Sequence, residues 1–574
     1  MEAPNQENNS IIMSVLDPAL LIESPYRSKW YKVVHWEYLP LLAIVLVTLI
    51  LHILSVNRPP TIVWDETWYV GDGRSIVSGT GDMRKEHPAL AKLFIVAGMK
   101  LFSGSEGPVG ESGAEVTRMV NSTNTEIPVS DASLFETGDA IRIDSEQILI
   151  TGVNYETNEL TVARGKDGTH AAGHISGDAI YLFHDNALGW RFFSIVFGTI
   201  NIILIYFICK KLQLSWRASV AATFLMALDD MTFLHSGLAL LDIYQVTFLL
   251  AGFLLYLHTK YLSTGVAFAL SACCKLVGVF GLFAVAVHWL IFRRDRWKWA
   301  VGSVFIAAAA FIFFTVLFDY FITGQIVNPY DRIKDLVVLT SINKFSDPPL
   351  SISSRPWTWL YPFIYPYTNA IVYSYDPQYV SFVSWTIQLL IVPVIIYMVM
   401  KAVKGNGPAR FVLTWFFGTY LLWMSDAFTN RVTFIFYFLP TTPAICIGLG
   451  IAFSDIMERL RSKRLRLGRV TPGMKASYAF IIFYFLLHTG IFIIFNPAVP
   501  TIIKTWLPPF SLGVTVTCTS TVYTNSMFYY SQSWFNYAYC GLMGMGGWWR
   551  SHLMPYRLSQ DIIKPEQDRH LFTK

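Results

Sequence analysis

Long apolar runs alternate with short polar or basic segments along most of the chain. A run of about twenty apolar residues spans the ~30 Å hydrocarbon core of a bilayer as a helix. The pattern therefore predicts about eleven transmembrane helices, near residues 38–56, 188–208, 217–234, 238–257, 262–273, 276–292, 299–318, 382–400, 411–425, 432–453 and 478–495. The fifth run is short and the third contains Asp229 and Asp230, so the region 217–292 also allows other divisions.

The stretch between the first two predicted spans follows a different pattern. Residues 63–103 fit an amphipathic helix, whereas residues 115–183 alternate apolar and polar positions in short runs that Gly, Asn and Asp turns separate. This alternation predicts a small β module. Its tract GDAIRIDSEQILITGVNYETNELTVARGKDGTHAAGH resembles a small β repeat of phage structural proteins, and the resemblance implies adhesion or packing rather than chemistry.

Composition agrees with a membrane protein. The chain is 53% hydrophobic and only 14% charged, with a mean hydropathy of +0.43, values that exclude an ordinary soluble protein. Nothing in the charge pattern indicates nucleic-acid binding. The six cysteines form no CxxC and no Cys/His group with zinc-ligand spacing, so no metal site is expected from them.

Lysines and arginines gather in alternate loops, which are expected to be cytoplasmic. The basic clusters are Arg27, Lys29 and Lys32; Lys210 and Lys211; Arg293, Arg294, Arg296 and Lys298; Lys401, Lys404 and Arg410; and Arg459, Arg461, Lys463, Arg464, Arg466, Arg469 and Lys475. The expected organisation is a cytoplasmic N-terminus (1–37), a first span with outer amphipathic helices (38–103), a β-rich outer insert (104–185), spans two to seven (186–318), an outer loop (319–381), spans eight to eleven (382–496) and an outer tail (497–574).

An acidic pair follows the first predicted span in the segment WDETWYV, which places Asp65 and Glu66 at the membrane surface. Transfer of a sugar to a hydroxyl needs a carboxylate that takes the acceptor proton, and such assistance is typically worth 10² to 10⁴ in rate. Two adjacent carboxylates in a partly dry site also raise one another's pKa, which suits a base that works near neutral pH. The alternative is structural, with Asp65 as a helix N-cap and Glu66 in the first turn.

Seven segments, taken in order, closely resemble the protein O-mannosyltransferase family, within the GT-C group of lipid-carrier-dependent glycosyltransferases. They are WDETWYV, EHPALAKLFI, GWRFFSIVFGTINIILIYFI, LHSGLALLDIYQVTFLLAG, SACCKLVGVFGLF, RPWTWL and TFIFYFLPTTPAI. The resemblance covers most of the chain except the β insert and the tail. It implies a GT-C fold and a membrane glycosyltransferase that transfers a hexose, with mannose expected, from a polyprenyl- or dolichyl-phosphate carrier to a hydroxyl, with inversion. Protein Ser or Thr is the acceptor that the family implies.

The resemblance also implies roles for individual residues. Asp65 and Glu66 correspond to the family's catalytic acidic pair, His87 to Lys92 to its outer-loop HPPLAK segment, and Arg191 to a functionally important arginine that opens the second span. Physically, a guanidinium at the outer mouth of a helix can pair with a phosphate in a bidentate way and stabilise it as it leaves. The alternative for Arg191 is snorkelling to lipid headgroups, and for His87 and Lys92 simply the start of a helix.

Four further residues are candidates for substrate binding, each with a structural alternative. Asp229 and Asp242 flank a predicted outer turn and match acidic positions of the family, but either can equally form a buried ion pair. Lys275 in CCKLVG matches the family's KW.G segment and either contacts phosphate or caps a helix. Arg355 in SSRPWTWLYP lies in the second large outer loop beside tryptophans that either stack on a sugar or sit in the interfacial belt.

The chain departs from the family at three places. Gly237 stands where the family usually has an arginine, and the late YHYLP segment reads FYFLP around Tyr437 and Pro440. The β-trefoil insert of eukaryotic members is absent, and a different β module occupies the first outer loop. These departures concern sugar binding and the choice of acceptor.

Other classes of function remain open at this point. A transporter or flippase would use the acids as relay groups near the midplane of paired repeats, yet no such repeat is visible. A receptor or scaffold needs far fewer spans. Within the enzyme class, the acceptor is either a protein or a lipid or glycan. No P-loop or GxGxxG pattern occurs, so no nucleotide is expected, and neither a cofactor nor an obligatory metal is expected.

The expected location is the cell membrane with the site on the outer face, or the lumenal face of the ER membrane in a eukaryote. Cys518 and Cys540 lie in the outer tail, where they either form a disulfide or remain free thiols. The sequence leaves the oligomeric state undetermined.

Overall fold

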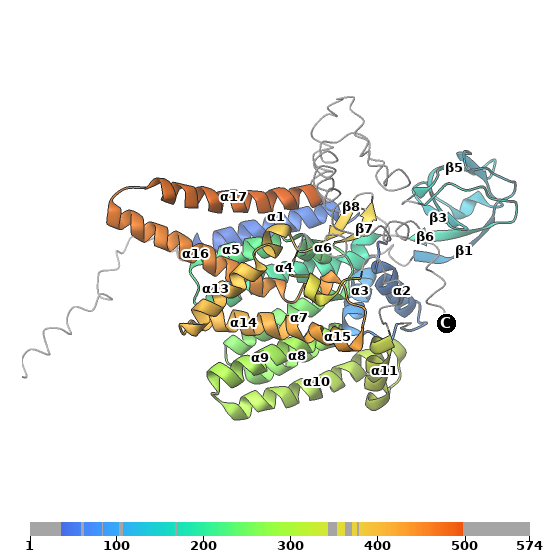
Figure 1. The fold of residues 1–574 in the computed structure, drawn as a ribbon. Coiled ribbons are helices and arrows are strands. Elements are labelled where there is room, and N and C mark those ends of the chain that lie inside the picture. The colour runs from blue at the N-terminus through green and yellow to red at the C-terminus, as the bar shows by residue number, and fades with distance from the viewer. Residues whose placement is uncertain are drawn as a thin grey trace, which may run out of the picture.

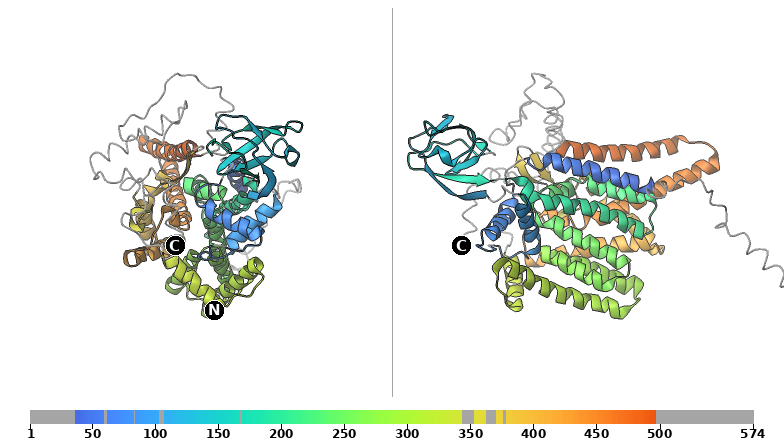
Figure 2. Two further views of the ribbon diagram at one scale, coloured as in Figure 1. Left: turned by 90° about the vertical axis from the view of Figure 1, so that its right-hand side faces the viewer. Right: turned by 180° about the vertical axis from the view of Figure 1, so that it is seen from behind.

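A bundle of helices forms the body of the protein, with a small β-sheet beyond one end of it (Figure 1). The computed structural model describes residues 36–58, 62–82, 84–102, 107–166, 169–184, 186–342, 353–361, 370–375 and 378–496. Figure 2 shows from two further sides that the sheet projects from the bundle rather than packing within it.

The helices follow the apolar runs of the sequence. They are α1 (Leu39–Ser55), α2 (Glu66–Val77), α3 (Leu90–Leu101), α4 (Ala187–Lys211), α5 (Trp216–Ala227), α6 (Asp230–Gly237), α7 (Leu241–Leu257), α8 (Tyr261–Cys274), α9 (Val279–His288), α10 (Trp297–Thr323), α11 (Pro329–Ile342), α12 (Trp385–Gln388), α13 (Ile391–Val403), α14 (Gly407–Tyr420), α15 (Asp426–Thr429), α16 (Thr442–Leu467) and α17 (Pro472–Phe495). A helix overlaps each run from which a span was predicted. The amphipathic region over 63–103 contains two helices, α2 and α3, joined by a loop.

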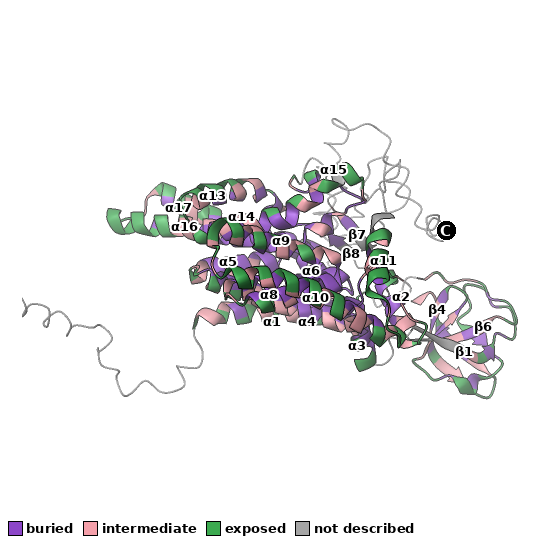
Figure 3. Cartoon of the chain, turned by 90° about the horizontal axis from the view of Figure 1, so that it is seen from below, coloured by how far each residue is buried: buried purple, intermediate pink, exposed green. Residues whose placement is uncertain are grey.

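Several helices are suited to contact with lipid. Within the described residues, five helical segments are long and apolar enough to cross a membrane, and α6 with α7 adds a sixth if the pair, bent by 110°, is one span. In α1, α10 and α17 no more than 28% of the apolar window is buried inside the protein, and Figure 3 shows exposed residues along α10 and α17. Exposed apolar helix faces need lipid around them. The chain is therefore an integral membrane protein, and the number of eleven spans stays a prediction.

The predicted span over 217–234 is broken in the structure, because α5 ends at Ala227 and α6 begins at Asp230. The Asp229 carboxylate accepts hydrogen bonds from the backbone N–H groups of Thr232 (3.0 Å) and Ser384 (2.8 Å) and from the Thr232 hydroxyl (2.8 Å). An N-cap of this kind satisfies amide groups that a new helix leaves without partners. Asp229 therefore fixes the start of α6, which the apolar pattern did not reveal.

Glycines let α3 and α6 approach α4 closely. A Cβ atom at Gly98 of α3 would lie 2.2 Å from the carbonyl oxygen of Gly189 in α4, and one at Gly198 of α4 would lie 2.3 Å from Cβ of Ser236 in α6. Both distances are far shorter than van der Waals contact. These two close contacts hold the N-terminal half of α4 against α3 and α6.

The insert is a six-stranded antiparallel sheet in the order β1-β6-β3-β4-β5-β2. Its strands are β1 (Gly107–Glu115), β2 (Glu126–Pro128), β3 (Ala140–Ile143), β4 (Glu146–Asn154), β5 (Glu159–Ala163) and β6 (Ala179–His184). Alternate residues of β3 and β5 are buried, as the two-residue period of the sequence predicted, and they build a hydrophobic core of the insert's own around Ile141, Ile148 and Leu160. The expected small all-β insert is confirmed. A separate hairpin, β7 (Ile371–Tyr375) and β8 (Gln378–Ser381), lies between α11 and α12.

The two ends of the bundle differ in chemistry. The insert, α2, α3 and α11 lie at one end, and the connection between α16 and α17 lies at the other (Figure 1). Helix α4 begins at Ala187, just after the insert, and ends at Lys210 and Lys211, while the last turn of α16 carries Arg464 and Arg466. These basic groups thus lie away from the insert, as the charge pattern predicted. Which side of a membrane each end faces remains a prediction.

Candidate functional site

Glu66 and Arg191 form a buried ion pair at the end of the bundle that carries the insert. Glu66 lies in the first turn of α2 and Arg191 in the second turn of α4, and both side chains have no exposed surface. The Arg191 guanidinium donates to both carboxylate oxygens, with Nε 2.8 Å from Oε1 and Nη2 2.6 Å from Oε2. Bidentate pairing is the strongest geometry available to an arginine and a carboxylate.

The remaining hydrogen-bonding capacity of this pair is also used. The Glu66 carboxylate accepts from the backbone N–H of Val63 (3.0 Å) and of Ala239 (2.9 Å), and Arg191 Nη1 donates to the carbonyl of Val56 (2.7 Å). The pair therefore joins the end of the first span, the start of α4 and the turn between α6 and α7. A carboxylate that accepts four hydrogen bonds is held in place, which suits positioning better than proton transfer.

Asp65, one residue earlier, has the opposite surroundings. Its side chain is partly buried, and it makes no capping hydrogen bond to α2. Among the described residues no hydrogen bond to its carboxylate is found, so the N-cap alternative does not hold. Burial raises the pKa of Asp65 to about 6. The positive charges of Lys275 and Arg84 oppose this increase, and the negative charge of Asp242 adds to it. Asp65 is thus a carboxylate able to accept a proton near neutral pH.

The backbone before Asp65 is strained. Trp64 has a φ of +46°, in the left-handed region that bulky residues rarely adopt. Such conformations persist only when the surrounding structure enforces them, and they gather at functional sites. Here the neighbouring Glu66, anchored to Arg191 and Val63, holds the turn that presents Asp65.

Lys275 and Asp242 form a second ion pair close to Asp65. Lys275 Nζ lies 2.7 Å from Asp242 Oδ1 and 4.8 Å from the centroid of the Tyr437 ring. Lys275 follows the last residue of α8, and Asp242 is in the first turn of α7. Both charges influence the pKa of Asp65, so the structure brings these three predicted residues together.

The segment from His87 to Lys92 divides into two environments. His87 packs against the Tyr69 ring, with centroids 5.7 Å apart, and burial lowers its pKa well below the usual value, assisted by Lys275, Lys92, Arg431 and Arg84. His87 therefore lies in the same group of charges as Asp65. Helix α3 begins at Leu90, so Pro88 precedes it rather than standing in its first turn.

Lys92 is fully buried and faces two carboxylates. Its Nζ lies 2.8 Å from Asp72 Oδ2 and 2.6 Å from Asp82 Oδ1, and it donates to the carbonyl of Arg84 (2.5 Å). Its charge is thus paired with two carboxylates of the protein, and it donates hydrogen bonds to Asp82 and to the Arg84 carbonyl. Lys92 thus ties α3 to α2 and to the loop between them, which favours the structural interpretation over substrate contact.

Two other candidates lie apart from Asp65. Asp229 is the N-cap described above, with its carboxylate on Thr232 and Ser384. Arg355 Nη2 donates to Asn430 Oδ1 (2.6 Å), and its guanidinium lies 5.8 Å from the Trp357 ring. Neither charge contributes to the pKa of Asp65 or His87. Cys518 and Cys540 lie outside the described residues.

Several partners were not identified from the sequence. Arg84 stands over the Trp68 ring at 3.4 Å, and Tyr69 has its pKa raised by burial and by Asp65. Arg332 of α11 donates to Asp319 Oδ2 (2.6 Å) and to the carbonyls of Lys85 (2.5 Å) and His87 (3.4 Å). The sequence signal for such a partner was an acidic residue at the end of an apolar span, such as Asp319.

Comparison with known proteins connects this geometry to a family. Residues 164–328, which include Arg191, Asp242 and Lys275, match the family described as dolichyl-phosphate-mannose-protein mannosyltransferase. A curated protein of Mycolicibacterium smegmatis, named polyprenol-phosphate-mannose–protein mannosyltransferase, is 37% identical over 73 residues. That alignment covers 13% of this chain and only 14% of the relative's length.

Solved structures extend the likeness to the whole fold. A chain of the S. cerevisiae protein O-mannosyltransferase Pmt1-Pmt2 complex bound to the sugar donor aligns over 81% of this chain and 90% of its own, with 10% identity and a TM-score of 0.55. ArnT from Cupriavidus metallidurans bound to undecaprenyl phosphate aligns over 81% of this chain and 71% of its own, with 12% identity and a TM-score of 0.44, too low to carry an argument.

These findings confirm the expected GT-C fold and the resemblance drawn from the seven segments. The chain has the fold of a protein O-mannosyltransferase, and over residues 164–328 it carries the sequence pattern of the dolichyl-phosphate-mannose-protein mannosyltransferase family.

Proposed function

We propose that this protein is a membrane glycosyltransferase that transfers mannose from a polyprenyl- or dolichyl-phosphate carrier to a hydroxyl group of a protein. One observation carries the proposal. Asp65 is a carboxylate with a pKa raised to about 6, and the charge of Lys275 acts on it. Its neighbour Glu66 is paired with Arg191. The names of the relatives, which are mannosyltransferases that act on protein, support the choice of donor and acceptor.

In the proposed reaction, Asp65 is the general base. The acceptor oxygen attacks the anomeric carbon from the face opposite the phosphate, while Asp65 takes the hydroxyl proton. The bond between the anomeric carbon and the phosphate oxygen breaks, and the polyprenyl phosphate leaves with the electron pair. Attack from the opposite face inverts the anomeric configuration. General-base assistance typically contributes 10² to 10⁴ in rate.

The leaving phosphate needs positive charge, and Lys275 and Arg84 are better placed to supply it than Arg191. The guanidinium of Arg191 donates to Glu66 and Val56, whereas the charges of Lys275 and Arg84 both affect the pKa of Asp65. We assign Arg191 and Glu66 the role of a positioning pair that holds the turn before α2. Stabilising negative charge as it develops on the phosphate is often the largest single contribution to a rate.

The proposed site faces the outer side, because the basic ends of α4 and α16 lie at the opposite end of the bundle and basic residues favour the cytoplasm. A carrier lipid would then keep its isoprenoid in the bilayer and present its phosphate and sugar near Asp65. In a bacterium this is the outer face of the cell membrane, and in a eukaryote the lumenal face of the ER.

The first prediction compares Asp65→Asn with Glu66→Gln in transfer of labelled mannose from polyprenyl-phosphate mannose by the purified protein. Asp65→Asn should lower transfer by about 10² to 10⁴ while the thermal midpoint is kept or raised, because it removes the base and a buried charge but no hydrogen bond. Glu66→Gln should lower the thermal midpoint as well, since breaking a buried ion pair costs roughly 3–5 kcal/mol.

Asp331→Asn serves as the matched control, because Asp331 is an exposed carboxylate of α11 at the same end of the bundle. It should leave both transfer and stability unchanged. Full transfer by Asp65→Asn would overturn the assignment of the base. Label that appears in lipid or glycan but never in protein would keep the chemistry and replace the acceptor, and carrier movement without release of sugar would favour a flippase.

A further inference from the structure

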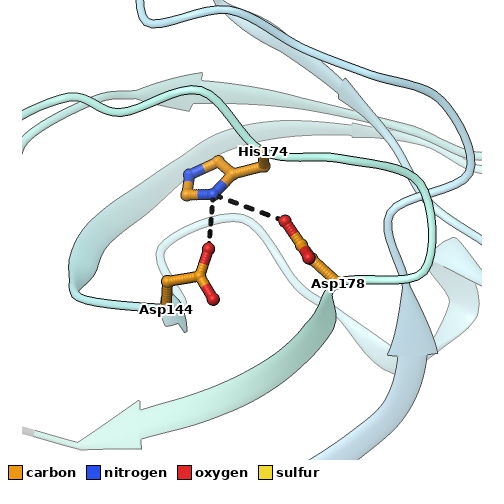
Figure 4. Close-up of side chains that lie close together, drawn as sticks. All are labelled: Asp144, His174 and Asp178. Carbon is orange, nitrogen blue, oxygen red and sulfur yellow. Dashed lines mark hydrogen bonds and ion pairs between the residues drawn. The ribbon is translucent and has the colours of Figure 1, made fainter.

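A buried histidine faces two carboxylates in the β insert, away from the proposed reaction site. His174 lies in the loop before β6, Asp144 in the turn between β3 and β4, and Asp178 directly before β6. His174 Nδ1 is 3.3 Å from Asp144 Oδ2 and 3.9 Å from Asp178 Oδ2, and Figure 4 shows both carboxylates turned toward this ring nitrogen. The three ligand atoms all lie within 4.8 Å of one another.

The other side of the ring fixes its tautomer. His174 Nε2 is 2.9 Å from Oε2 of the buried Glu146. Glu146 is itself held by Arg164, whose Nε and Nη2 lie 2.8 and 2.7 Å from its oxygens, and by the backbone N–H groups of Gly165 and Ala172, each at 2.9 Å.

All of these groups donate to the Glu146 carboxylate, so it acts as an acceptor, and Nε2 of His174 carries the hydrogen and donates it. In the neutral ring Nδ1 then presents a lone pair to two carboxylates that are acceptors as well. Three lone-pair groups that converge on one point repel one another unless a positive charge, either a proton on Nδ1 or a metal ion, lies between them. The His174 side chain has no exposed surface, so it has little freedom to turn away.

The spacing suits a small metal ion. Ligands at about 2.0–2.2 Å in a tetrahedral site lie roughly 3.3–3.6 Å from one another. The separation from His174 to Asp144 already matches this, and the one to Asp178 needs a shift of about half an ångström. A nitrogen with two carboxylates suits zinc and similar transition metals, whereas calcium and magnesium prefer all-oxygen sites. The link from His174 to Glu146 has the form of the carboxylate–histidine–zinc arrangement that orients metal ligands.

We propose that Asp144, His174 and Asp178 bind one divalent transition-metal ion of the zinc class. The ion would clip the β3–β4 turn to the loop that leads into β6. Asp144 is mostly exposed, which leaves a path for the ion from solvent, and the Asp178 carboxylate is held in place by the N–H of Ile175 (2.8 Å). The site is structural and separate from the mannosyl transfer proposed above, for which no metal is invoked.

The test is a zinc titration of the full-length protein, purified with a tag free of histidine and treated with a chelator. Isothermal titration should find one site in the wild type that is lost in the double variant Asp144→Asn/Asp178→Asn. Each single variant should weaken binding by about tenfold or more, since even outer partners of metal ligands are worth 10–100-fold. Both substitutions leave the His174–Glu146 contact intact, so the insert should stay folded.

Asp131→Asn is the matched control, because Asp131 is a carboxylate of the same insert that only caps Ser133. It should bind zinc like the wild type. In addition, zinc should slow proteolysis of the insert in the wild type and the control but not in the double variant. Equal zinc binding by the wild type and the double variant, or no binding by either, would overturn the proposal, as would a site that takes calcium or magnesium but not zinc.

Discussion

Asp65 and Glu66 are neighbours in sequence with opposite surroundings. Glu66 is buried and accepts hydrogen bonds from Arg191, Val63 and Ala239, whereas Asp65 is partly buried with no hydrogen bond found to its carboxylate in the described part of the chain. A carboxylate fixed by several hydrogen bonds and a desolvated one beside it can take different roles in a reaction. The pair is therefore interpreted as one base and one positioning group.

The second prediction concerns the pH dependence of transfer. Because the pKa of Asp65 is raised from 3.8 to about 6, its base form is lost as the pH falls below about 6, and kcat/KM should then drop about tenfold per pH unit. For stability the sign is opposite. Burial disfavours the ionised form, so stability is greatest below the unfolded pKa and decreases as the pH rises to about 6.

The measurement is a pH profile of kcat/KM from pH 4.5 to 8, with the thermal midpoint recorded at each pH. The thermal midpoint is the control, because it should not decrease together with kcat/KM as the pH falls. An acid limb centred near 4, the ordinary value for an aspartate, would contradict a desolvated base at Asp65.

At the scale of elements, the contact between α3 and α4 positions the charged groups. Gly98 and Gly189 bring the two helices together at the turn of α4 that carries Arg191. Lys92, one and a half turns before Gly98, fixes α3 to α2 through Asp72 and Asp82. A change in the distance between α3 and α4 should therefore disturb both the Glu66–Arg191 pair and the ion pairs of Lys92.

The third prediction compares Gly98→Ala with Gly71→Ala. A Cβ at Gly98 meets the Gly189 carbonyl at 2.2 Å, and since backbone moves with difficulty, the helices must separate. Such overpacking typically costs about 1–3 kcal/mol and should also lower transfer. At Gly71, inside α2, a Cβ meets nothing within 4 Å, so alanine should be neutral or stabilise by up to about 1 kcal/mol.

Thermal unfolding in detergent, read beside the transfer assay, checks this pair. Both substitutions add the same methyl group to a helical glycine, so the difference between them reports the crossing of α3 and α4 alone. Equal midpoints for the two variants would show that the helices can part without consequence.

At the scale of the whole molecule, the insert is a separate unit. Its core contains only its own residues, and it projects from the bundle (Figure 2). Gly107 and His184, at its two ends, are paired across β1 and β6. Paired residues on antiparallel strands lie about 4.5–5.5 Å apart, so a short linker can replace everything between them.

The fourth prediction is that replacing residues 107–184 by a short Gly-Ser linker leaves the helical bundle folded and able to cleave its donor. The expected result is a monodisperse protein in detergent whose rate of sugar release from the carrier is close to that of the full chain. Transfer to a protein acceptor is measured in parallel, because the insert lies at the same end as Asp65. Loss of sugar release in a folded deletion variant would make the insert part of the reaction site.

The sequence by itself determined the membrane character, the β insert, the position of the acidic pair and the family resemblance. These follow from local patterns: apolar runs of membrane length, a period of two, and short motifs in order. It did not find the break at Asp229, because the capping partner Ser384 lies far away along the chain.

Only the tertiary structure showed that, among the described residues, Glu66 is hydrogen-bonded while no hydrogen bond is found to the Asp65 carboxylate, and which cations influence Asp65. Glu66 finds Arg191 125 positions along the chain and Ala239 173 positions along it, and no local pattern reports such pairings. The same holds for Lys92, a phosphate-binding candidate whose partners Asp72 and Asp82 favour a structural role. Ion pairs and hydrogen bonds form between residues that are far apart in the sequence, so the chemistry of each side chain depends on the folded structure. The apolar pattern that drives folding, in contrast, can be read directly from the sequence.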